Sequence, residues 1–344
     1  MATAAQRRIK SVSYAKYGYI FILPFFVIYF IFMLYPLVDT FIVSFKGNGL
    51  GPGVIARHES QRDWVGLASY KNILYKSGAN HEQFLDSLKN TVIIWVGNFL
   101  PQISLSLLLA VWFTDMRVKM PGKGFFKVVM YLPNIITAAS VAALFYTLFG
   151  GEYGVLNTII DPKNASLWLG PADVWRARIL VMFIQIWMWF GNTMIMLMSG
   201  IQGINESLFE AAEIDGANSS QTFWRITFPL LKTIMVYTLL TSMIGGLQMF
   251  DIPFMLSGNN NGHVNNEYIK TVACFIYEKF KGTENDMMYG VAGAASVILF
   301  FITSILGALV FYVQRDKDAI EKNRKRKEAM KEAKRRAKGG GFSI

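Results

Sequence analysis

Amide, indole and hydroxyl side chains recur inside otherwise apolar stretches of the chain, with a spacing suited to ligand binding. Gln185, Trp189 and Asn192 stand at positions i, i+4 and i+7 of one stretch, which places them on one face of a helix. Aromatic faces offer stacking and amides offer hydrogen bonds, and a neutral, hydroxyl-rich ligand such as a sugar needs both. We therefore expect this helix face to line a binding cavity.

Two neighbouring apolar stretches carry further candidate cavity residues. Asn134 and Thr137 follow Pro133. A second group interrupts a long apolar run and comprises Ser242, Gly246, Gln248 and Asp251. Polar groups inside lipid cost free energy, so they face the protein interior or a water-filled path. Amides and glycines also serve helix packing, but their occurrence on three consecutive stretches favours a substrate pathway.

The sequence does not indicate enzymatic chemistry. The histidines fall in predicted polar loops without HExxH spacing, and the single cysteine, Cys274, offers neither a disulfide nor a metal cluster. Neither a GxxxxGK[ST] phosphate loop nor a GxSxG nucleophile elbow occurs. We expect no catalytic residue, no metal site, no cofactor and no nucleotide site on this chain.

The apolar stretches are long enough to cross a membrane. The chain has 344 residues, of which 53% are hydrophobic, and a bilayer core is crossed by about 20 apolar residues in a helix. Six runs reach that length, broken only by Asp39, Lys232 and Asp251, and they cover 19–45, 91–114, 128–150, 179–201, 226–256 and 291–313. The expected fold class is therefore an all-α integral membrane protein with six transmembrane helices, occupying residues 19–313. A soluble helical bundle would need polar faces that these runs lack.

The distribution of lysine and arginine predicts the orientation in the membrane. Basic residues precede the first run in the segment 1–18, lie between the second and third runs, and crowd the tail 314–344. Since basic residues accumulate on the cytoplasmic side, we expect both termini in the cytoplasm. The first run is too long for a signal peptide and lacks a cleavage site, so we expect it to be retained. The formal charge of +11 then indicates contact with anionic lipid rather than nucleic acid.

The loop 202–225, on the expected cytoplasmic side, contains the stretch EAAEIDGANSSQTFWRITFP. Asn205 is a plausible N-cap for a short helix through about Asp215, and Gly216 can adopt the left-handed conformation that ends it. Ser219 or Ser220 is expected to cap a second helix leading into the fifth run. The result is a helix lying across the bundle that can transmit force.

This stretch resembles the signature loop of the membrane subunits of binding-protein-dependent ATP-binding-cassette importers. The residues that the resemblance assigns to contact with an ATPase are Glu210, Ala211, Ala212, Asp215, Gly216, Ala217 and Phe223. The segments VGLASYKNIL, SLKNT, YLPNII, YGVLN and GGLQMFD are similar to the first-subunit type of maltose, glycerol-3-phosphate and multiple-sugar permeases. Phe228 stands where leucine is usual, and GNNNG replaces the family's Gly-Gly-Pro after the fifth run.

The resemblance implies a division of labour among several subunits. It implies the fold of a type I importer transmembrane domain, in the plasma membrane of a bacterium or archaeon. The implied partners are a different second permease, two ATPase subunits that bind ATP and magnesium, an extracytoplasmic solute-binding protein and a sugar or oligosaccharide. Two alternatives stay open. The same machine could import glycerol phosphate, which would require cationic side chains in the cavity, or the chain could be a stand-alone channel or membrane enzyme.

Overall fold

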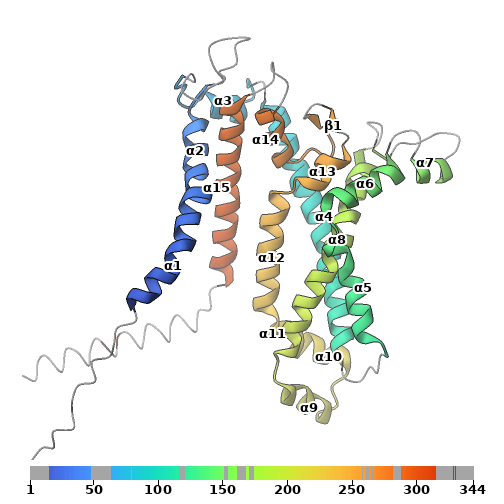
Figure 1. Ribbon diagram of the computed structural model, residues 1–344. Helices are drawn as coiled ribbons and strands as arrows, with labels where there is room; N and C mark the ends of the chain where they lie inside the picture. The colour runs from blue at the N-terminus through green and yellow to red at the C-terminus, as the bar shows by residue number, and fades with distance from the viewer. Residues whose placement is uncertain are drawn as a thin grey trace, which may run out of the picture. The chain divides into compact units, whose positions relative to one another are not determined.

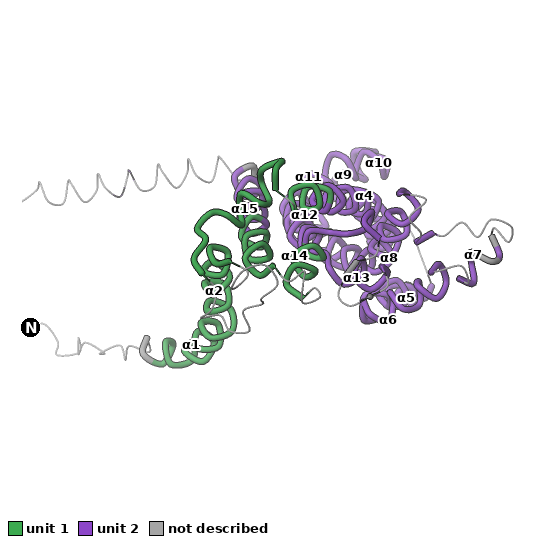
Figure 2. The backbone as a smooth tube through the Cα atoms, turned by 90° about the horizontal axis from the view of Figure 1, so that it is seen from above, with its two compact units in different colours: residues 1–86, 259–263, 273–298 green, residues 87–258, 264–272, 299–344 purple. Residues whose placement is uncertain are grey.

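The part of the chain that the structure describes is almost entirely helical (Figure 1). The computed structural model describes residues 15–47, 63–78, 80–115, 121–150, 154–160, 168–169, 174–257, 259–260, 263–264, 266–281, 288–314, 328 and 330. Most of the predicted N-terminal segment 1–18 and nearly all of the predicted basic tail 314–344 lie outside these residues. The chain divides into two compact units (Figure 2): unit 1 contains 1–86, 259–263 and 273–298, and unit 2 contains 87–258, 264–272 and 299–344.

The helices occur in the order expected from the apolar runs. The first half comprises α1 (Ala15–Tyr29), the π-helical η1 (Phe30–Leu34), α2 (Tyr35–Ser44), α3 (Ala68–Leu74), α4 (His81–Thr114), α5 (Lys123–Ile135), α6 (Ala138–Phe149) and α7 (Val155–Ile160). The second half comprises α8 (Val174–Gln202), α9 (Glu206–Ile214), α10 (Ser219–Thr222), the π-helical η3 (Phe223–Thr227), α11 (Phe228–Leu230), α12 (Lys232–Leu247), α13 (Asp251–Leu256), α14 (Val272–Lys281) and α15 (Tyr289–Gln314). Two short strands, β1 (Asn259–Asn260) and β2 (His263–Val264), precede α14.

Five helical stretches are long and apolar enough to cross a membrane, and a bent helix pair supplies a sixth candidate. The five are Tyr17–Ser44, His81–Thr114, Val174–Gln202, Lys232–Leu256 and Tyr289–Tyr312. The bent pair is α5 with α6, whose axes differ by 87°. Within the described residues an all-α membrane fold with up to six spans is confirmed, and the third run is a bent pair of helices rather than one continuous helix.

The bend between α5 and α6 has a local cause. Pro133 lies in the last turn of α5, where it can donate no backbone hydrogen bond, and Ile136 is extended with ψ of 135°. Thr137 then caps a new helix, because its side-chain oxygen accepts a hydrogen bond from the backbone nitrogen of Ser140 at 3.3 Å. The sequence YLPNIITAAS therefore ends one helix and begins another within four residues.

Helix α8 forms the centre of unit 2. Its first half buries Leu180 and Ile184 in a cluster with Val141 of α6, and its second half buries Met194 and Leu197 in another. Helix α5 runs along α8 (Figure 1). A side chain at Gly191 of α8 would overlap the backbone carbonyl of Met130 in α5, so this glycine permits the close approach of the two helices.

A strap formed by residues 266–272 crosses one end of unit 2 and is fixed by buried polar groups. Arg178 of α8 donates to the Asn90 side-chain oxygen at 2.6 Å and to the Tyr268 carbonyl at 3.1 Å. Asn90 donates in turn to the carbonyls of Glu267 at 2.7 Å and Lys270 at 3.1 Å. Because Arg178 is only 8% exposed, each of these hydrogen bonds offsets part of the cost of burying a cation.

The packing of α5 on α8 predicts that Gly191→Ala destabilises the chain. The new methyl group must displace the backbone of α5, and overpacking of this kind costs about 1–3 kcal/mol. Thermal unfolding of the detergent-solubilised protein should show a lower midpoint. The matched control is Gly124→Ala in α5, where an added Cβ has no neighbour within 4 Å. An equal midpoint for both variants would contradict the close contact.

Candidate functional site

A cavity of about 410 Å³ lies within unit 2, between α4, α8, α12 and α13. Seven of the nine residues expected in a substrate pathway line it together. They are Gln185, Trp189 and Asn192 from α8, and Ser242, Gly246, Gln248 and Asp251 from α12 and the start of α13. The volume is within the range of small-molecule sites in proteins.

Asn134 and Thr137 are not among the residues that line this cavity. Asn134 is half-buried near the end of α5, and Thr137 is used as the N-cap of α6. Only Ala138 from this bend reaches the cavity wall. Both residues lie at the 87° bend between α5 and α6.

Helix α4 supplies cavity residues that the sequence analysis missed. Trp95, Asn98 and Gln102 line the cavity, and they stand at i, i+3 and i+7 of the second apolar run. This spacing is the same kind of signal that identified Gln185, Trp189 and Asn192, so it could have been found in the sequence. Other missed lining residues are Thr193, Tyr237, Thr238, Thr241 and Phe250.

Hydrogen bonds between side chains join the helices around the cavity. The Trp95 indole nitrogen donates to the Ser242 hydroxyl at 3.3 Å, which joins α4 to α12. The Gln102 amide donates to the Thr193 hydroxyl at 2.9 Å, which joins α4 to α8. A Cβ at position 246 would overlap the Trp95 ring. Because Gly246 has no side chain, the Trp95 indole can lie in the cavity wall.

The cavity wall is polar but nearly without charge. Among its described lining residues Asp251 is the one acid, and lysine, arginine and histidine do not occur. The remaining polar groups are amides, hydroxyls and the Trp95 indole, beside the rings of Trp189, Tyr237 and Phe250. Such a wall can stack against a ring and exchange hydrogen bonds with hydroxyl groups, but it offers an anion no cationic partner.

Helix α9 lies at the other end of unit 2 from α13 (Figure 1) and begins and ends as expected. The Asn205 side chain accepts from the Ser207 backbone nitrogen at 3.1 Å, and Gly216 has φ of 73°. The next helix is capped by Asn218 rather than by Ser219 or Ser220. Asn218 and Gln221 exchange side-chain to backbone bonds at 2.8 and 2.9 Å, and this reciprocal capping box uses both side chains at once.

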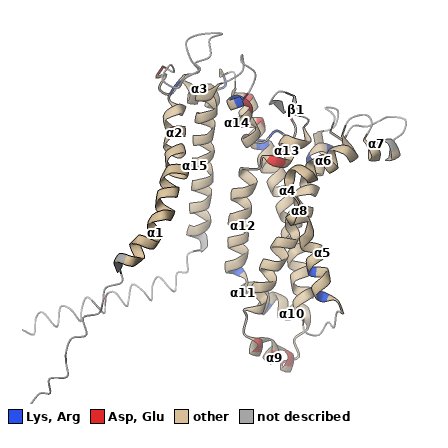
Figure 3. Cartoon of the chain, viewed as in Figure 1, with Lys and Arg blue, Asp and Glu red and all other residues tan. Residues whose placement is uncertain are grey.

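The residues of the loop signature divide between two faces. Ala212 is buried and Phe223 and Ala217 are half-buried, whereas Glu210, Ala211, Asp215 and Gly216 are exposed. Figure 3 marks acidic residues on α9. Ile214, which the sequence analysis did not select, is 86% exposed at the end of this helix. The exposed face thus combines acidic groups with a large apolar side chain.

Residues 79–317 match the family described as binding-protein-dependent transport system inner membrane component. The chain belongs to this family. The chain, called the permease below, is 29% identical to the arabinooligosaccharides transport system permease protein AraP of Bacillus subtilis (strain 168), over 89% of this chain and 92% of that protein. It is 31% identical to the sn-glycerol-3-phosphate transport system permease protein UgpA of Agrobacterium fabrum, over 72% of this chain and 80% of that protein.

A solved structure has the same fold as the permease. It is the crystal structure of a bacterial ABC transporter involved in the import of the acidic polysaccharide alginate, with a TM-score of 0.69 and 21% identity. The match covers 87% of this chain and 94% of that chain. The permease is thus a transport component and a multi-pass membrane protein, as the sequence predicted.

The cavity predicts which positions of α8 meet water. In the permease, Asn192→Cys should react with a water-soluble thiosulfonate reagent, whereas Ile195→Cys, also exposed but outside the cavity lining, should face lipid and stay unmodified. The native Cys274 is fully buried, so its background reaction should be low. Labelling of the protein in liposomes followed by mass spectrometry measures both. Equal modification at the two positions would contradict a water-filled cavity.

Proposed function

We propose that the chain is the membrane-spanning permease subunit of an ATP-driven importer of sugars or oligosaccharides, and that the 410 Å³ cavity forms its part of the solute path. The observation that carries the proposal is the convergence of amides, hydroxyls and aromatic rings from four helices on one nearly uncharged cavity. A polar cavity inside an apolar helical bundle is a characteristic of solute pathways.

The chemistry of the cavity supports a neutral saccharide as the solute. The similarity to AraP, a permease for arabinooligosaccharides, agrees with amide and indole groups in the wall. The similarity to UgpA makes glycerol phosphate the second candidate. A phosphate would leave its charge without a cationic partner in this wall, which disfavours it because buried charges need such partners.

The proposed contact with the ATPase is the exposed face of α9, which carries Glu210, Ala211 and Asp215. Gly216 ends the helix and directs the chain back toward α10. The Phe223 ring packs edge to face against the Trp224 ring, with 4.9 Å between ring centres. In this proposal the contact stabilises the loop 202–225. Movement of an ATPase that holds α9 would then be passed to the ends of α8 and α12.

The full machine that we propose contains this permease, a second and different permease, two ATPase subunits that bind ATP and magnesium, and an extracytoplasmic solute-binding protein. One chain carries one EAA loop, so two ATPases require a second loop from another subunit. The loop 202–225 and both termini face the cytoplasm in this proposal. The basic tail 314–344 contacts anionic lipid there.

The coupling role predicts that Glu210→Lys and Gly216→Pro abolish sugar uptake without preventing membrane insertion. Lysine reverses the charge of the docking face. Proline cannot adopt φ of 73° and removes the backbone donor that bonds the Glu213 carbonyl at 3.0 Å. Uptake by proteoliposomes that contain the assembled importer measures the effect.

Asp86→Lys, at an exposed position of α4 far along the chain from the loop, is the matched charge reversal and should keep uptake within about twofold of the parent, since exposed substitutions rarely matter. If Glu210→Lys and Gly216→Pro both transport normally while remaining assembled, α9 is not the coupling element.

The cavity role predicts that Gln185→Ala and Gln248→Ala each weaken solute affinity during transport. Loss of one hydrogen bond to a sugar hydroxyl costs about 1 kcal/mol, which corresponds to about fivefold. The apparent KM for uptake across a panel of neutral oligosaccharides should rise, while the amount of assembled ATPase is unchanged. Asn134→Ala is the matched control, because Asn134 is a span amide outside the cavity lining. Equal KM values for all three variants would assign these amides to helix packing.

A further inference from the structure

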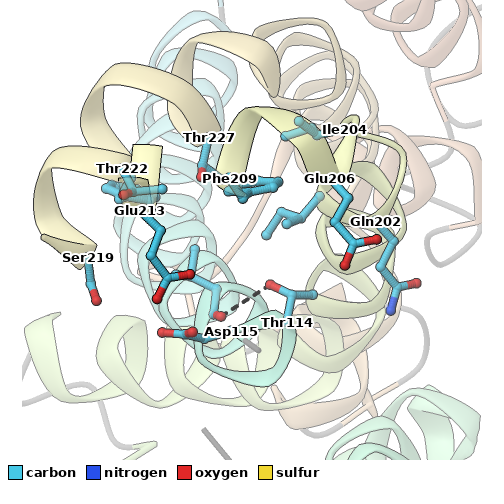
Figure 4. A pocket seen from close by; sticks show the side chains of 13 residues that line it. Thr114, Asp115, Gln202, Ile204, Glu206, Phe209, Glu213, Ser219, Thr222 and Thr227 are labelled. Carbon is cyan, nitrogen blue, oxygen red and sulfur yellow. Dashed lines mark hydrogen bonds between the residues drawn. The ribbon is translucent and has the colours of Figure 1, made fainter. Parts of the chain in front are cut away.

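A second cavity, of about 320 Å³, lies in unit 2 behind α9 (Figure 4). The last turns of α4 and α8 form part of its wall, and α9, α10 and η3 form the rest. Among the described residues, none lines both this cavity and the 410 Å³ cavity. The loop signature does not account for it either, since Phe223 is the one residue of the signature that lines it.

The wall of the second cavity combines apolar surface with negative charge. Val111, Ile201, Ile204, Phe209 and Phe223 supply apolar groups. Asp115, Glu206 and Glu213 supply carboxylates, and no lysine, arginine or histidine occurs among its described lining residues. Figure 4 shows Glu206 and Glu213 on opposite sides of the space, with the ring of Phe209 between them. Asp115 and Glu213 also have interactions within the chain, so Glu206 is the carboxylate that a positively charged ligand with an apolar body would meet.

Thr227 adds an independent indication of a ligand. The residue is only 4% exposed and lines the cavity, and its hydroxyl has no hydrogen-bond partner within the described part of the chain. Thr222 and Thr238 bond the carbonyl four residues earlier, at 3.1 and 2.8 Å. In η3 the Phe223 carbonyl instead accepts from the Phe228 nitrogen, in π-helical register. The Thr227 hydroxyl is therefore left to face the cavity, where it can donate one hydrogen bond and accept others from a ligand.

We propose that this cavity binds a small organic cation, in which a protonated amine, amidine or guanidinium is joined to an apolar body. Glu206 supplies the opposite charge, and the Thr227 hydroxyl accepts a hydrogen bond from the cationic group. The rings of Phe209 and Phe223 pack on the apolar body, and an aromatic face also attracts a cation. A volume of about 320 Å³ is at the lower end of the range for small-molecule sites.

A cation bound here would join α9 to the ends of α4 and α8. It would stabilise the position of α9 in which the cavity is open and oppose any other position. If α9 is the contact with an ATPase, the ligand regulates coupling; this consequence rests on the proposed function, whereas binding itself does not.

Saturation-transfer NMR on the full chain in lipid nanodiscs tests the proposal with benzamidine as the probe. Benzamide has nearly the same shape without the charge, and benzoate reverses it. We expect saturable binding of benzamidine, and binding of benzamide and benzoate weaker by about tenfold or more, as for loss of a charge-assisted hydrogen bond.

Variants assign the binding to this cavity. Glu206→Gln should weaken benzamidine binding about tenfold and Thr227→Val by about fivefold, as expected for one hydrogen bond each. Glu210→Gln is the matched control, since Glu210 is an exposed acid of the same helix that does not line the cavity, and it should bind benzamidine as the parent does.

Two results would overturn the proposal: equal binding of benzamidine and benzamide, or equal effects of Glu206→Gln and Glu210→Gln on benzamidine binding. None of these measurements requires transport. A failure of sugar uptake by the assembled importer would instead count against the proposed function alone.

Discussion

Polar groups within an apolar helical bundle must meet one another or water, and unit 2 is arranged around this constraint. Gln102 meets Thr193, Trp95 meets Ser242, and Arg178 meets Asn90. Each pair joins two segments that are distant in the sequence, so the pairs also determine which helices are neighbours. The amides of Gln185 and Asn192 have no such partner among the residues that the structure describes, and they border the cavity instead. The same physical requirement thus produces both the packing of the bundle and its binding site.

Breaks in the helices determine where the cavity can lie. Helix α12 ends at Leu247, and the turn through Gln248 and Phe250 precedes α13. The Met249 carbonyl, which the break frees from helical bonding, accepts from the Thr271 hydroxyl of the strap at 2.6 Å. Irregular backbone is tolerated at membrane depth where it is buried in protein or borders a cavity. Here the strap supplies the missing donor, and the break turns polar side chains into the space between the helices.

The sequence was informative where one local rule decides the outcome. The periodicity of Gln185, Trp189 and Asn192 predicted one face of an unbroken helix, and the pattern from Asn205 to Gly216 predicted the bounds of α9. The cap of α10 was predicted wrongly because two local signals compete: Asn218 displaces Ser219 as the cap, since Gln221 completes its capping box. Thr137 is the N-cap of α6, and its place in a substrate pathway stays a prediction.

Other features depend on tertiary packing, and no local sequence pattern predicts them. The closeness of α5 to α8 at Gly191, the contact of Gly246 with Trp95, and the second cavity all arise between segments far apart in the sequence. A glycine in an apolar run shows only that a close approach is possible. Trp95, Asn98 and Gln102 are a different case, because their spacing was available in the sequence.

The two cavities of unit 2 are connected by one rigid element. Helix α8 contributes Asn192 to the first cavity and Gln202 to the second, and ten residues of helix span about 15 Å. The connection from α8 to α9 is tight, since the Gly203 and Ile204 nitrogens bond the carbonyls of Ser199 and Ile201 at 3.2 and 3.1 Å. With so short a connection, α9 has little freedom to move without α8. A displacement of α9 must therefore either tilt α8, and with it the face that carries Gln185, Trp189 and Asn192, or break these bonds.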